Sequence, residues 1–490
     1  MLLPAILLIP LLTGIVCMAI RSVPWLERIN LISFAAVAAL SGMLIAQVVE
    51  SGAVAAWSSF LYADALSALV IGITAFVSLV CAIYSIGYFR SDKANGRVTL
   101  AQIRRYYRLT PLFVFSMLLV TLANNLGVMW VAIEGSTLAS VLLIAFYNEK
   151  TSLEAAWKYI IIGSVGIALA LFGTILTYYS AAATLGAHTA TGMNWSLLTT
   201  VADKFNPHAM QLGFIMALLG YGTKAGLAPM HTWKPDAYAE SPIPAATLLG
   251  AGVLNCAIYG ILRFYILTVK CIGPAFPGKL LLFFGLASML VAVPFIVVQR
   301  NYRRLLAYSS IEHAGIIVTA VGFGGKLGML GAMLHMIYHA TAKPLLFFCA
   351  GDIQQHFGTP FSRKVRGVIR VLPVTGVLFL MATLAVTAVP PFGVFQSEFT
   401  ILSGALSANH PILAAIFLFA VVAIFAGFLR QITKIDLGLP RDVKITPTSN
   451  PWKTGVMIFL AAFIVWLGFD LPPLIFKLVE SAAQIIGGNL

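Results

Sequence analysis

Charged residues are scarce in this chain of 490 residues. Asp, Glu, Lys and Arg make up 10% of it, whereas hydrophobic residues make up 60% and the mean hydropathy is +0.94. An ordinary soluble domain carries about 25% charged residues. The composition therefore excludes that class and predicts an integral membrane protein.

The chain also lacks the motifs of a redox or nucleotide site. Its five cysteines stand singly, with no Cys-x-x-Cys pair and no His/Cys cluster at metal-ligand spacing. No Gly-x-Gly-x-x-Gly stretch and no phosphate-binding loop occurs, and GFGGKLG at 322–328 resembles one only superficially. We expect neither a metal nor a cofactor in this chain, nor a redox active site of its own. Any redox chemistry then belongs to partner subunits.

Long apolar runs are what the chain has instead. A membrane-spanning helix needs about 20 mostly apolar residues. Fourteen such runs occur, at about 2–20, 29–49, 64–89, 109–125, 126–148, 157–180, 208–232, 242–268, 279–299, 305–323, 327–350, 371–408, 411–430 and 452–476. The first has no basic segment before it and no Ala-x-Ala cleavage site, so we expect a retained helix. The sequence predicts an all-α polytopic membrane protein with fourteen transmembrane helices.

The net charge of +14 is explained by where the basic residues fall. With loops assigned alternately to the two sides, 23 of the 31 Lys and Arg residues, Lys234 among them, lie on one side and six, including Arg263, on the other. Lys224 and Lys343 fall inside the membrane. Because Lys and Arg favour cytoplasmic loops, the richer side is expected to be cytoplasmic, with both termini on the outer face. Contact with anionic lipid fits the basic loops, and nucleic-acid binding is an unnecessary explanation.

Two ionisable residues at membrane depth predict a buried pair. Glu134 lies near the middle of the fifth run and Lys224 near the centre of the seventh. A charge there costs roughly 2.5–3.5 kcal/mol on insertion scales, and pairing offsets that cost. We predict that Glu134 pairs with Lys224. A purely structural salt bridge is the alternative.

The eleventh run carries a polar stripe. In LHMIYHATAKPLLFF, His335, His339 and Lys343 fall at positions i, i+4 and i+8, which lie on one helix face. Histidine titrates closest to neutral pH, so a hydrated stripe of this kind can pass protons. The alternative is that the stripe only forms hydrogen bonds to a neighbouring helix.

Proline interrupts two of the runs beside a charge. Pro229 follows Lys224, and Pro390 and Pro391 precede Glu398; proline removes a backbone donor and clashes with the preceding turn. Runs four to eight and nine to thirteen each hold five spans, with the fourth broken, and an odd number inserts the second copy upside down. This is the inverted-repeat arrangement of secondary transporters. The predicted divisions are a three-helix segment with a basic loop (1–108), a first repeat (109–270), a second repeat (271–435), and a loop with a last helix (436–490).

Four acidic residues lie near the ends of the predicted spans, and each has one or two possible roles. Asp236 and Glu240, in KPDAYAESP, are assigned equally to helix-end structure and to proton entry. Asp64 opens the third run and is predicted to be an N-cap. Asp352 is expected to cap the end of the eleventh helix or to pair with a basic loop.

Several of these stretches together resemble a known family. TKAGLAPMHTWKPDAYAESPIPAATLLG, RRLLAYSSIEHAGII, HMIYHATAKPLLFFCAGDI and PPFGVFQSEFTILSG are similar to stretches in the antiporter-like subunits of respiratory complex I, of Mrp-type sodium/proton antiporters and of membrane-bound nickel–iron hydrogenases such as formate hydrogenlyase. The resemblance covers runs four to thirteen. SSIEHAGII, with Glu312 before His313, and EAAWKYIIIGSVG resemble the hydrogenase branch most. Glu312 is a further candidate for proton entry, with Asp236 and Glu240.

The resemblance implies a mechanism and an assembly. It implies fourteen helices with the seventh and twelfth broken, a switching Glu134–Lys224 ion pair, a central axis of His335, His339 and Lys343, and Glu398 at the end of the path. It also implies other membrane subunits and a peripheral redox arm, which would hold the nickel–iron and iron–sulfur centres. The expected location is the cytoplasmic membrane of a bacterium or archaeon.

One position departs from the family pattern. Many members have a lysine in the eighth helix where this chain has Asn255, in VLNCAIYG. Asparagine carries no proton, so the path from Lys224 to the axis would run through water, or through His231 and His313. The alternatives are an Mrp-type cation/proton antiporter subunit, a complex I subunit, or a membrane scaffold that does not pump; the lack of a long amphipathic tail after residue 476 argues against the largest complex I subunit.

Overall fold

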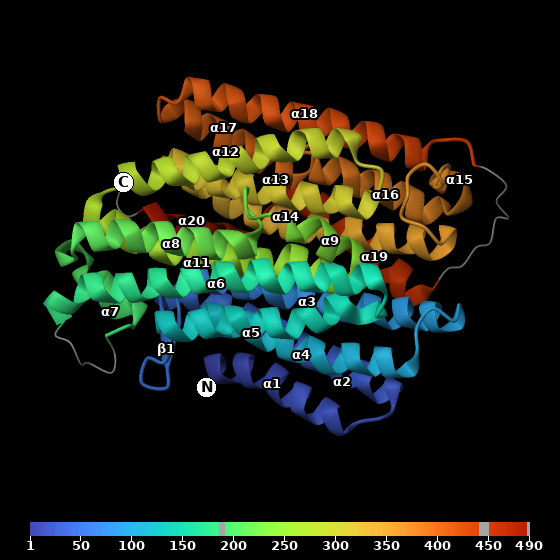
Figure 1. The fold of residues 1–490 in the computed structure, drawn as a ribbon, viewed down its shortest axis with the longest axis horizontal. Coiled ribbons are helices and arrows are strands. Elements are labelled where there is room, and N and C mark those ends of the chain that lie inside the picture. Colours follow the sequence, from blue (N-terminus) through green and yellow to red (C-terminus); the bar gives the residue numbers. More distant parts are fainter. Residues whose placement is uncertain (186–191, 441–449, 488–490) are drawn as a thin grey trace.

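Long, roughly parallel helices form a single bundle in the computed structural model, which describes residues 1–185, 192–440 and 450–487 (Figure 1). Arg441 and Lys444, counted above with the cytoplasmic residues, lie outside the described residues. The elements are α1 (Leu2–Ala19), α2 (Val23–Ser51), β1 (Val54–Ala56), β2 (Leu61–Ala63), α3 (Ala65–Ala94), α4 (Leu100–Leu122), α5 (Leu126–Ile144), η1 (Ala145–Tyr147), α6 (Lys150–Leu185), α7 (Trp195–Val201), η2 (Ala202–Lys204), α8 (Pro207–Ala225), α9 (Trp233–Glu240), α10 (Ile243–Thr247), η3 (Leu248–Val253), α11 (Leu254–Ile272), α12 (Ala275–Val298), α13 (Tyr302–Phe323), α14 (Gly325–Phe357), α15 (Val368–Val371), α16 (Pro373–Val386), α17 (Gly393–Ser407), α18 (Pro411–Asp436), α19 (Pro451–Phe469) and α20 (Pro473–Gly487).

The prediction of a multi-pass helical membrane protein is confirmed. Among the described residues, ten helical segments are long and apolar enough to cross a membrane. The other predicted spans correspond to α4, α8, α14 and the pair α16–α17, which carry more polar residues or are interrupted. The count of fourteen spans and the inverted repeat remain predictions.

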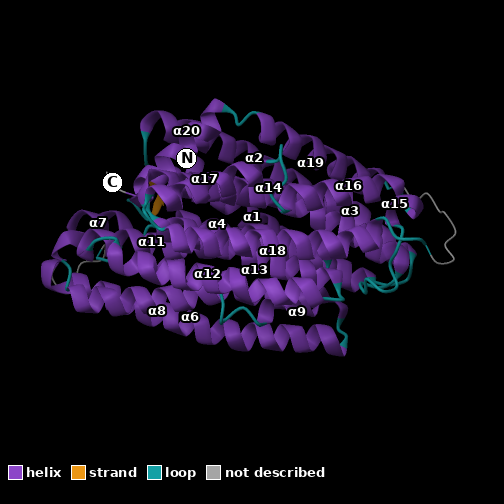
Figure 2. Cartoon of the chain, turned by 90° about the horizontal axis from the view of Figure 1, so that it is seen from above, coloured by secondary structure: helices purple, strands orange, loops and turns teal. Residues whose placement is uncertain are grey.

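Both proline-containing breaks lie where they were predicted. Helix α8 ends at Ala225, Gly226 follows with a φ of +78°, and the chain becomes helical again at Trp233, on the far side of Pro229. Helices α16 and α17 are likewise separated by a segment that contains Pro390 and Pro391. Loop segments inside the bundle, away from its two ends, are visible in Figure 2. Backbone polar groups freed at such breaks need partners inside the protein.

The last predicted run is broken as well, which the sequence reading missed. The run at 452–476 is split, because α19 ends at Phe469 and α20 begins at Pro473 after a short extended link. The consecutive prolines Pro472 and Pro473 account for the break, because neither has a backbone N–H to donate and their rings clash with the preceding turn. Single prolines such as Pro10 and Pro344 are accommodated inside helices of this bundle. Helix α20 packs against α3 and α14 along an apolar face of Leu478, Val479, Ala482, Ala483 and Ile486.

The basic connections gather at one end of the bundle. Arg97 donates to the carbonyl of Gln355, Arg105 to that of Phe146, and Arg303 to that of Tyr238. Helix α1 begins and α20 ends at the opposite end (Figure 1). This agrees with termini on a single side, although which side of the membrane that is stays a prediction.

Candidate functional site

Lys224 is buried at the end of α8, inside the first half of the bundle. Its side chain is 2% exposed, and its Nζ donates hydrogen bonds to Thr137 Oγ1 at 2.7 Å and to Tyr159 Oη at 2.6 Å. The ammonium also lies 4.9 Å from the centre of the Tyr159 ring. Hydroxyl groups from α5 and α6 therefore hold this lysine where α8 stops.

Glu134 lies one turn of α5 before Thr137, and the predicted direct ion pair with Lys224 is not formed in this structure. None of the ion pairs of the described residues joins the two, whose charged groups are therefore more than 4.0 Å apart. The Thr137 hydroxyl instead donates to Glu134 Oε2 at 3.2 Å while it accepts from Lys224. The sequence signal for this bridge was Thr137, a hydroxyl residue three positions after Glu134 and therefore on the same helix face. The prediction considered only the two charges and overlooked it.

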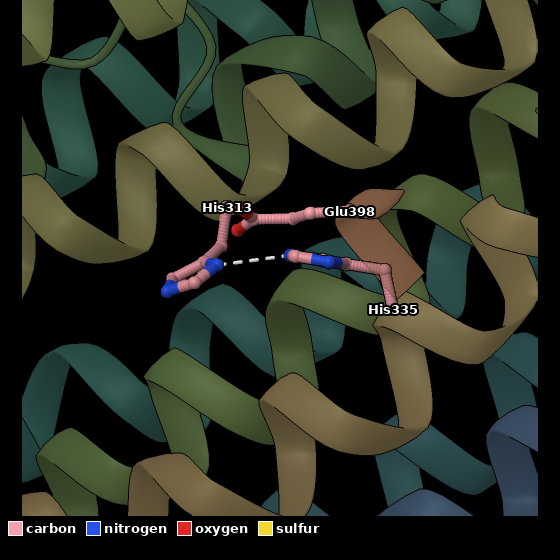
Figure 3. A group of neighbouring side chains, drawn as sticks. All are labelled: His313, His335 and Glu398. Atoms are coloured by element: carbon pink, nitrogen blue, oxygen red, sulfur yellow. Dashed lines mark hydrogen bonds between the residues drawn. The ribbon is translucent and has the colours of Figure 1, made fainter. Parts of the chain in front are cut away.

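Helices α13, α14 and α17 meet at His335 in the second half (Figure 3). His335 Nε2 shares a hydrogen bond of 2.9 Å with His313 Nδ1, and His335 Nδ1 shares one of 2.9 Å with Ser397 Oγ. Both nitrogens of His335 are thus engaged. A ring bonded on both sides can accept a proton at one nitrogen and release one from the other.

Glu398 completes this group on α17. One possible ligand atom from each of His313, His335 and Glu398 lies within 4.8 Å of the others, and all three residues are buried. This spacing would suit a metal ion, but His335 already uses both nitrogens, so a metal would have to break one of its hydrogen bonds. The arrangement fits proton exchange better than metal binding, and the absence of a metal from this chain stays a prediction.

His339 and Lys343 continue the stripe along α14, on the side that faces α13. The ring centres of His339 and His313 are 4.7 Å apart, and Lys343 Nζ donates to Ser309 Oγ at 2.8 Å. Neither nitrogen of His339 has a hydrogen-bond partner among the described groups. Glu312, 4% exposed, lies within electrostatic range of Lys343.

Lys234 joins the two halves, and the sequence analysis placed it wrongly in a cytoplasmic loop. Its side chain is 0% exposed, and its Nζ donates to the carbonyl of Ala225 at 2.7 Å and to that of Ser310 at 3.3 Å. Once the helix breaks after Ala225, the next turn of chain remains inside the bundle. The sequence signal for this burial was Pro229. Non-helical backbone at membrane depth is tolerated only where the protein buries it, so the residues that follow the break are expected to stay inside the bundle.

His231 and Asn255 are also buried, and neither is fully hydrogen-bonded. His231 is buried in the segment between α8 and α9, and its Nδ1 has no partner among the described groups. Asn255 lies on α11 just after the π-helical turn η3, where its Nδ2 donates to the Ala251 carbonyl and its Oδ1 is unpartnered. Such π-turns are frequent at functional sites.

Asp236 and Glu240 lie toward the basic end and have structural partners. Asp236 forms ion pairs with Lys158 at 3.0 Å and with Arg304 at 2.5 Å, and Glu240 accepts a hydrogen bond from Thr151 at 2.8 Å. These contacts favour the helix-end interpretation for Asp236. A part in proton entry stays a prediction for both residues.

Two further ion pairs stabilise the frame. Asp64 is the predicted N-cap, since its side chain accepts from Ser67 N, and it also pairs at 2.7 Å with Arg263, which is 2% exposed rather than in an outer loop. The guanidinium lies 4.0 Å from the Trp195 ring centre. Asp352 pairs at 2.8 Å with Lys453, which is buried in the first turn of α19 rather than in a basic loop, as the prediction had it.

These features define a membrane protein with broken helices and a buried titratable line, and the chain belongs to the family described as "NADH:quinone oxidoreductase/Mrp antiporter, TM", whose model matches residues 123–423. The model "NADH-Ubiquinone oxidoreductase (complex I), chain 5 N-terminus" matches residues 56–97. It is thus an antiporter-like membrane subunit of the hydrogenase, complex I and Mrp group.

The particular relatives cover nearly the whole chain. A hydrogenase-4 component F homolog of Methylacidiphilum infernorum (isolate V4) is 40% identical over 428 residues, 87% of this chain and 89% of the relative. Among solved structures, a chain of the membrane-bound sulfane sulfur reductase, an archaeal respiratory membrane complex, superposes with a TM-score of 0.87 at 23% identity, covering 99% of this chain and 97% of that one. A chain of the Mrp complex of Dietzia sp. DQ12-45-1b gives 0.86 at 18% identity, with 99% and 97% covered.

Proposed function

We propose that this chain moves protons across the membrane as a subunit of a redox-driven complex of the membrane-bound hydrogenase type. The observation that carries the proposal is the buried line of titratable side chains, from Lys224 through Lys343 and the histidines to Glu398. Ionisable groups inside a membrane protein are costly and typically mark ion or proton paths. The resemblance to the hydrogenase-4 component F homolog favours the hydrogenase type.

In the proposed mechanism, the Lys224 proton is released when its link to Glu134 through the Thr137 hydroxyl weakens. In the present arrangement Thr137 connects the two groups, so rotation of one hydroxyl alters the stabilisation of the Lys224 ammonium. A redox event in a neighbouring subunit would bias this position. Loss of a stabilising charge favours the neutral amine, at 1.36 kcal/mol for each tenfold change in proton affinity.

The released proton then travels through the second half of the bundle. Lys343 and His339 receive it, and His313 and His335 pass it on through their shared hydrogen bond to Glu398. Glu398 releases it toward the outer face. The breaks near Pro229 and Pro390 leave backbone carbonyls that can hold water beside the path.

The proposal includes partners and a location. Other membrane subunits and a peripheral redox arm would surround the chain, with nickel–iron and iron–sulfur centres held by those partners. The two superposed chains are each part of a membrane complex, which supports other membrane subunits as partners of this chain. We place the chain in the cytoplasmic membrane of a bacterium or archaeon, in contact with lipid and with both termini outside.

Purification through a tag on this chain tests the assembly. The complex is extracted in mild detergent, its subunits are identified by mass spectrometry, and nickel and iron are measured. Nickel together with iron–sulfur subunits is the expected result. Several antiporter-like subunits without metal, with transport that depends on sodium, would instead establish an Mrp-type exchanger, and a lone soluble partner without redox centres would favour a scaffold.

Thr137→Val tests the hydroxyl bridge. Valine keeps the shape but removes the donor to Glu134 and the acceptor of Lys224, so we expect proton translocation to fall about tenfold with assembly unchanged, corresponding to roughly 1.4 kcal/mol at the switching step. Translocation is measured with a pH-sensitive dye in proteoliposomes. Thr174→Val is the matched control, because Thr174 is also buried but donates only to the Ala170 carbonyl. Equal flux in the two variants would contradict a role for the bridge.

A further inference from the structure

Lys234 is a fully buried lysine with no carboxylate partner. None of the ion pairs of the described residues includes it, and both of its side-chain hydrogen bonds go to backbone carbonyls. By contrast, the buried Lys453 has Asp352 beside it. A buried ammonium without a counter-charge is expensive, so its presence at this position calls for an explanation.

The side chain of Lys234 bridges the two halves of the titratable line. Its acceptor Ala225 is the residue next to Lys224, and its acceptor Ser310 is the residue next to Ser309, the hydrogen-bond partner of Lys343. Lys234 and Lys343 are close enough for their like charges to interact. No other lysine of the described residues has hydrogen bonds to both segments.

The break in α8 is shaped around this side chain. A Cβ on Gly226 would lie 2.6 Å from Lys234 Cδ and 3.1 Å from its Nζ, so a glycine at that position leaves the room that the lysine fills. The backbone of Gly226 also has a φ of +78°, which glycine adopts without strain. Lys234 therefore lies inside the helix break, at the level where α8 ends.

We propose that Lys234 is the proton carrier between Lys224 and Lys343 in this chain, at the step for which Asn255 offers no titratable group. The inference rests on the proposed function. The Lys224 ammonium gives its proton through water to a neutral Lys234 amine, which becomes an ammonium and then passes a proton through water to the neutral amine of Lys343. Each transfer leaves a neutral amine behind, which can accept the next proton.

A structural role is the competing explanation. Helix C-termini favour cations that donate to their last carbonyls, and Lys234 does so at Ala225. Arginine separates the two explanations, because it keeps the charge and the donors but is not deprotonated in proteins. Glutamine is the second variant, since it keeps a donor for the carbonyl, is smaller than arginine in the space beside Gly226, and carries no proton.

The experiment compares Lys234→Arg and Lys234→Gln in the purified complex, reconstituted in proteoliposomes and driven by an imposed potassium diffusion potential. Both variants are expected to assemble, and proton flux is expected to fall about tenfold or more. Lys453→Arg, a matched buried lysine away from the line, is expected to keep its flux. Normal proton flux in either Lys234 variant would overturn the inference. If the arginine variant does not assemble, the flux of the glutamine variant decides.

Lys224→Arg, measured in parallel, keeps the two proposals apart. If it retains normal flux, the proposed function fails. If Lys224→Arg loses flux while the Lys234 variants keep it, the proposed function stands and only the carrier role of Lys234 is wrong.

Discussion

Replacement of Lys224 by methionine is expected to reduce proton translocation by about 10²-fold or more, the range typical of losing a positioned proton-transfer group, while the subunit still assembles. Methionine fills a similar volume without a titratable amine. Its neighbours Thr137 and Tyr159 are hydroxyls with alternative hydrogen-bond partners in Glu134 and Ser140. The bundle therefore loses a proton-binding group but no charge partner in direct contact.

The measurement is proton flux in proteoliposomes, with co-purification of the other subunits as the check on assembly. Lys158→Met is the control, because Lys158 is partly exposed on α6 and pairs with Glu154 and Asp236 near the basic end. We expect that variant to pump normally. Wild-type flux in the Lys224→Met complex would contradict the mechanism.

Asp64→Ala is expected to lower stability by about 3–5 kcal/mol, the range for removing one partner of a buried ion pair. The Arg263 guanidinium donates to both Asp64 oxygens at 2.7 Å and to Ser67 Oγ at 2.8 Å, and it is buried between aromatic rings. Without Asp64 it would remain as an uncompensated charge. Thermal unfolding of the complex in detergent measures the effect.

Two controls make this stability prediction specific. Glu154→Ala removes an exposed partner of Lys158 and is expected to cost about 0–1 kcal/mol, as surface pairs do. The double variant Asp64→Ala/Arg263→Leu removes both charges and is expected to recover part of the lost stability. Equal stability of Asp64→Ala and Glu154→Ala would show that the buried pair contributes little.

The membrane class, the helical breaks and the stripe on α14 could be predicted from the sequence because each depends on local features. Hydropathy locates apolar helices, proline marks positions where a helix can be interrupted, and residues spaced by four share a helix face. His335, His339 and Lys343 accordingly lie on one buried face. Asp64 was likewise predictable as an N-cap, because its partner Ser67 lies three residues away.

The remaining features depend on contacts between distant segments. Thr137 stands between the predicted pair, Arg263 turns inward to Asp64 across 199 residues, and Lys234 folds back into a break. The sequence analysis assigned each Lys or Arg near the end of an apolar run to a loop, and this rule placed Arg263 and Lys234 wrongly. Charge counting fixes an average bias between the two sides, and it carries no information on which individual residue is buried.

The most direct test of the central claim compares the wild-type complex with one carrying Lys343→Met, in proteoliposomes driven by the redox reaction of the complex. Lys343 lies in the second half of the line, on α14, and its side chain donates only to Ser309 Oγ. We predict that the wild type builds a proton gradient without sodium, and that the variant turns over its redox substrate but builds almost none. Equal gradients in the two complexes would contradict proton conduction along this line.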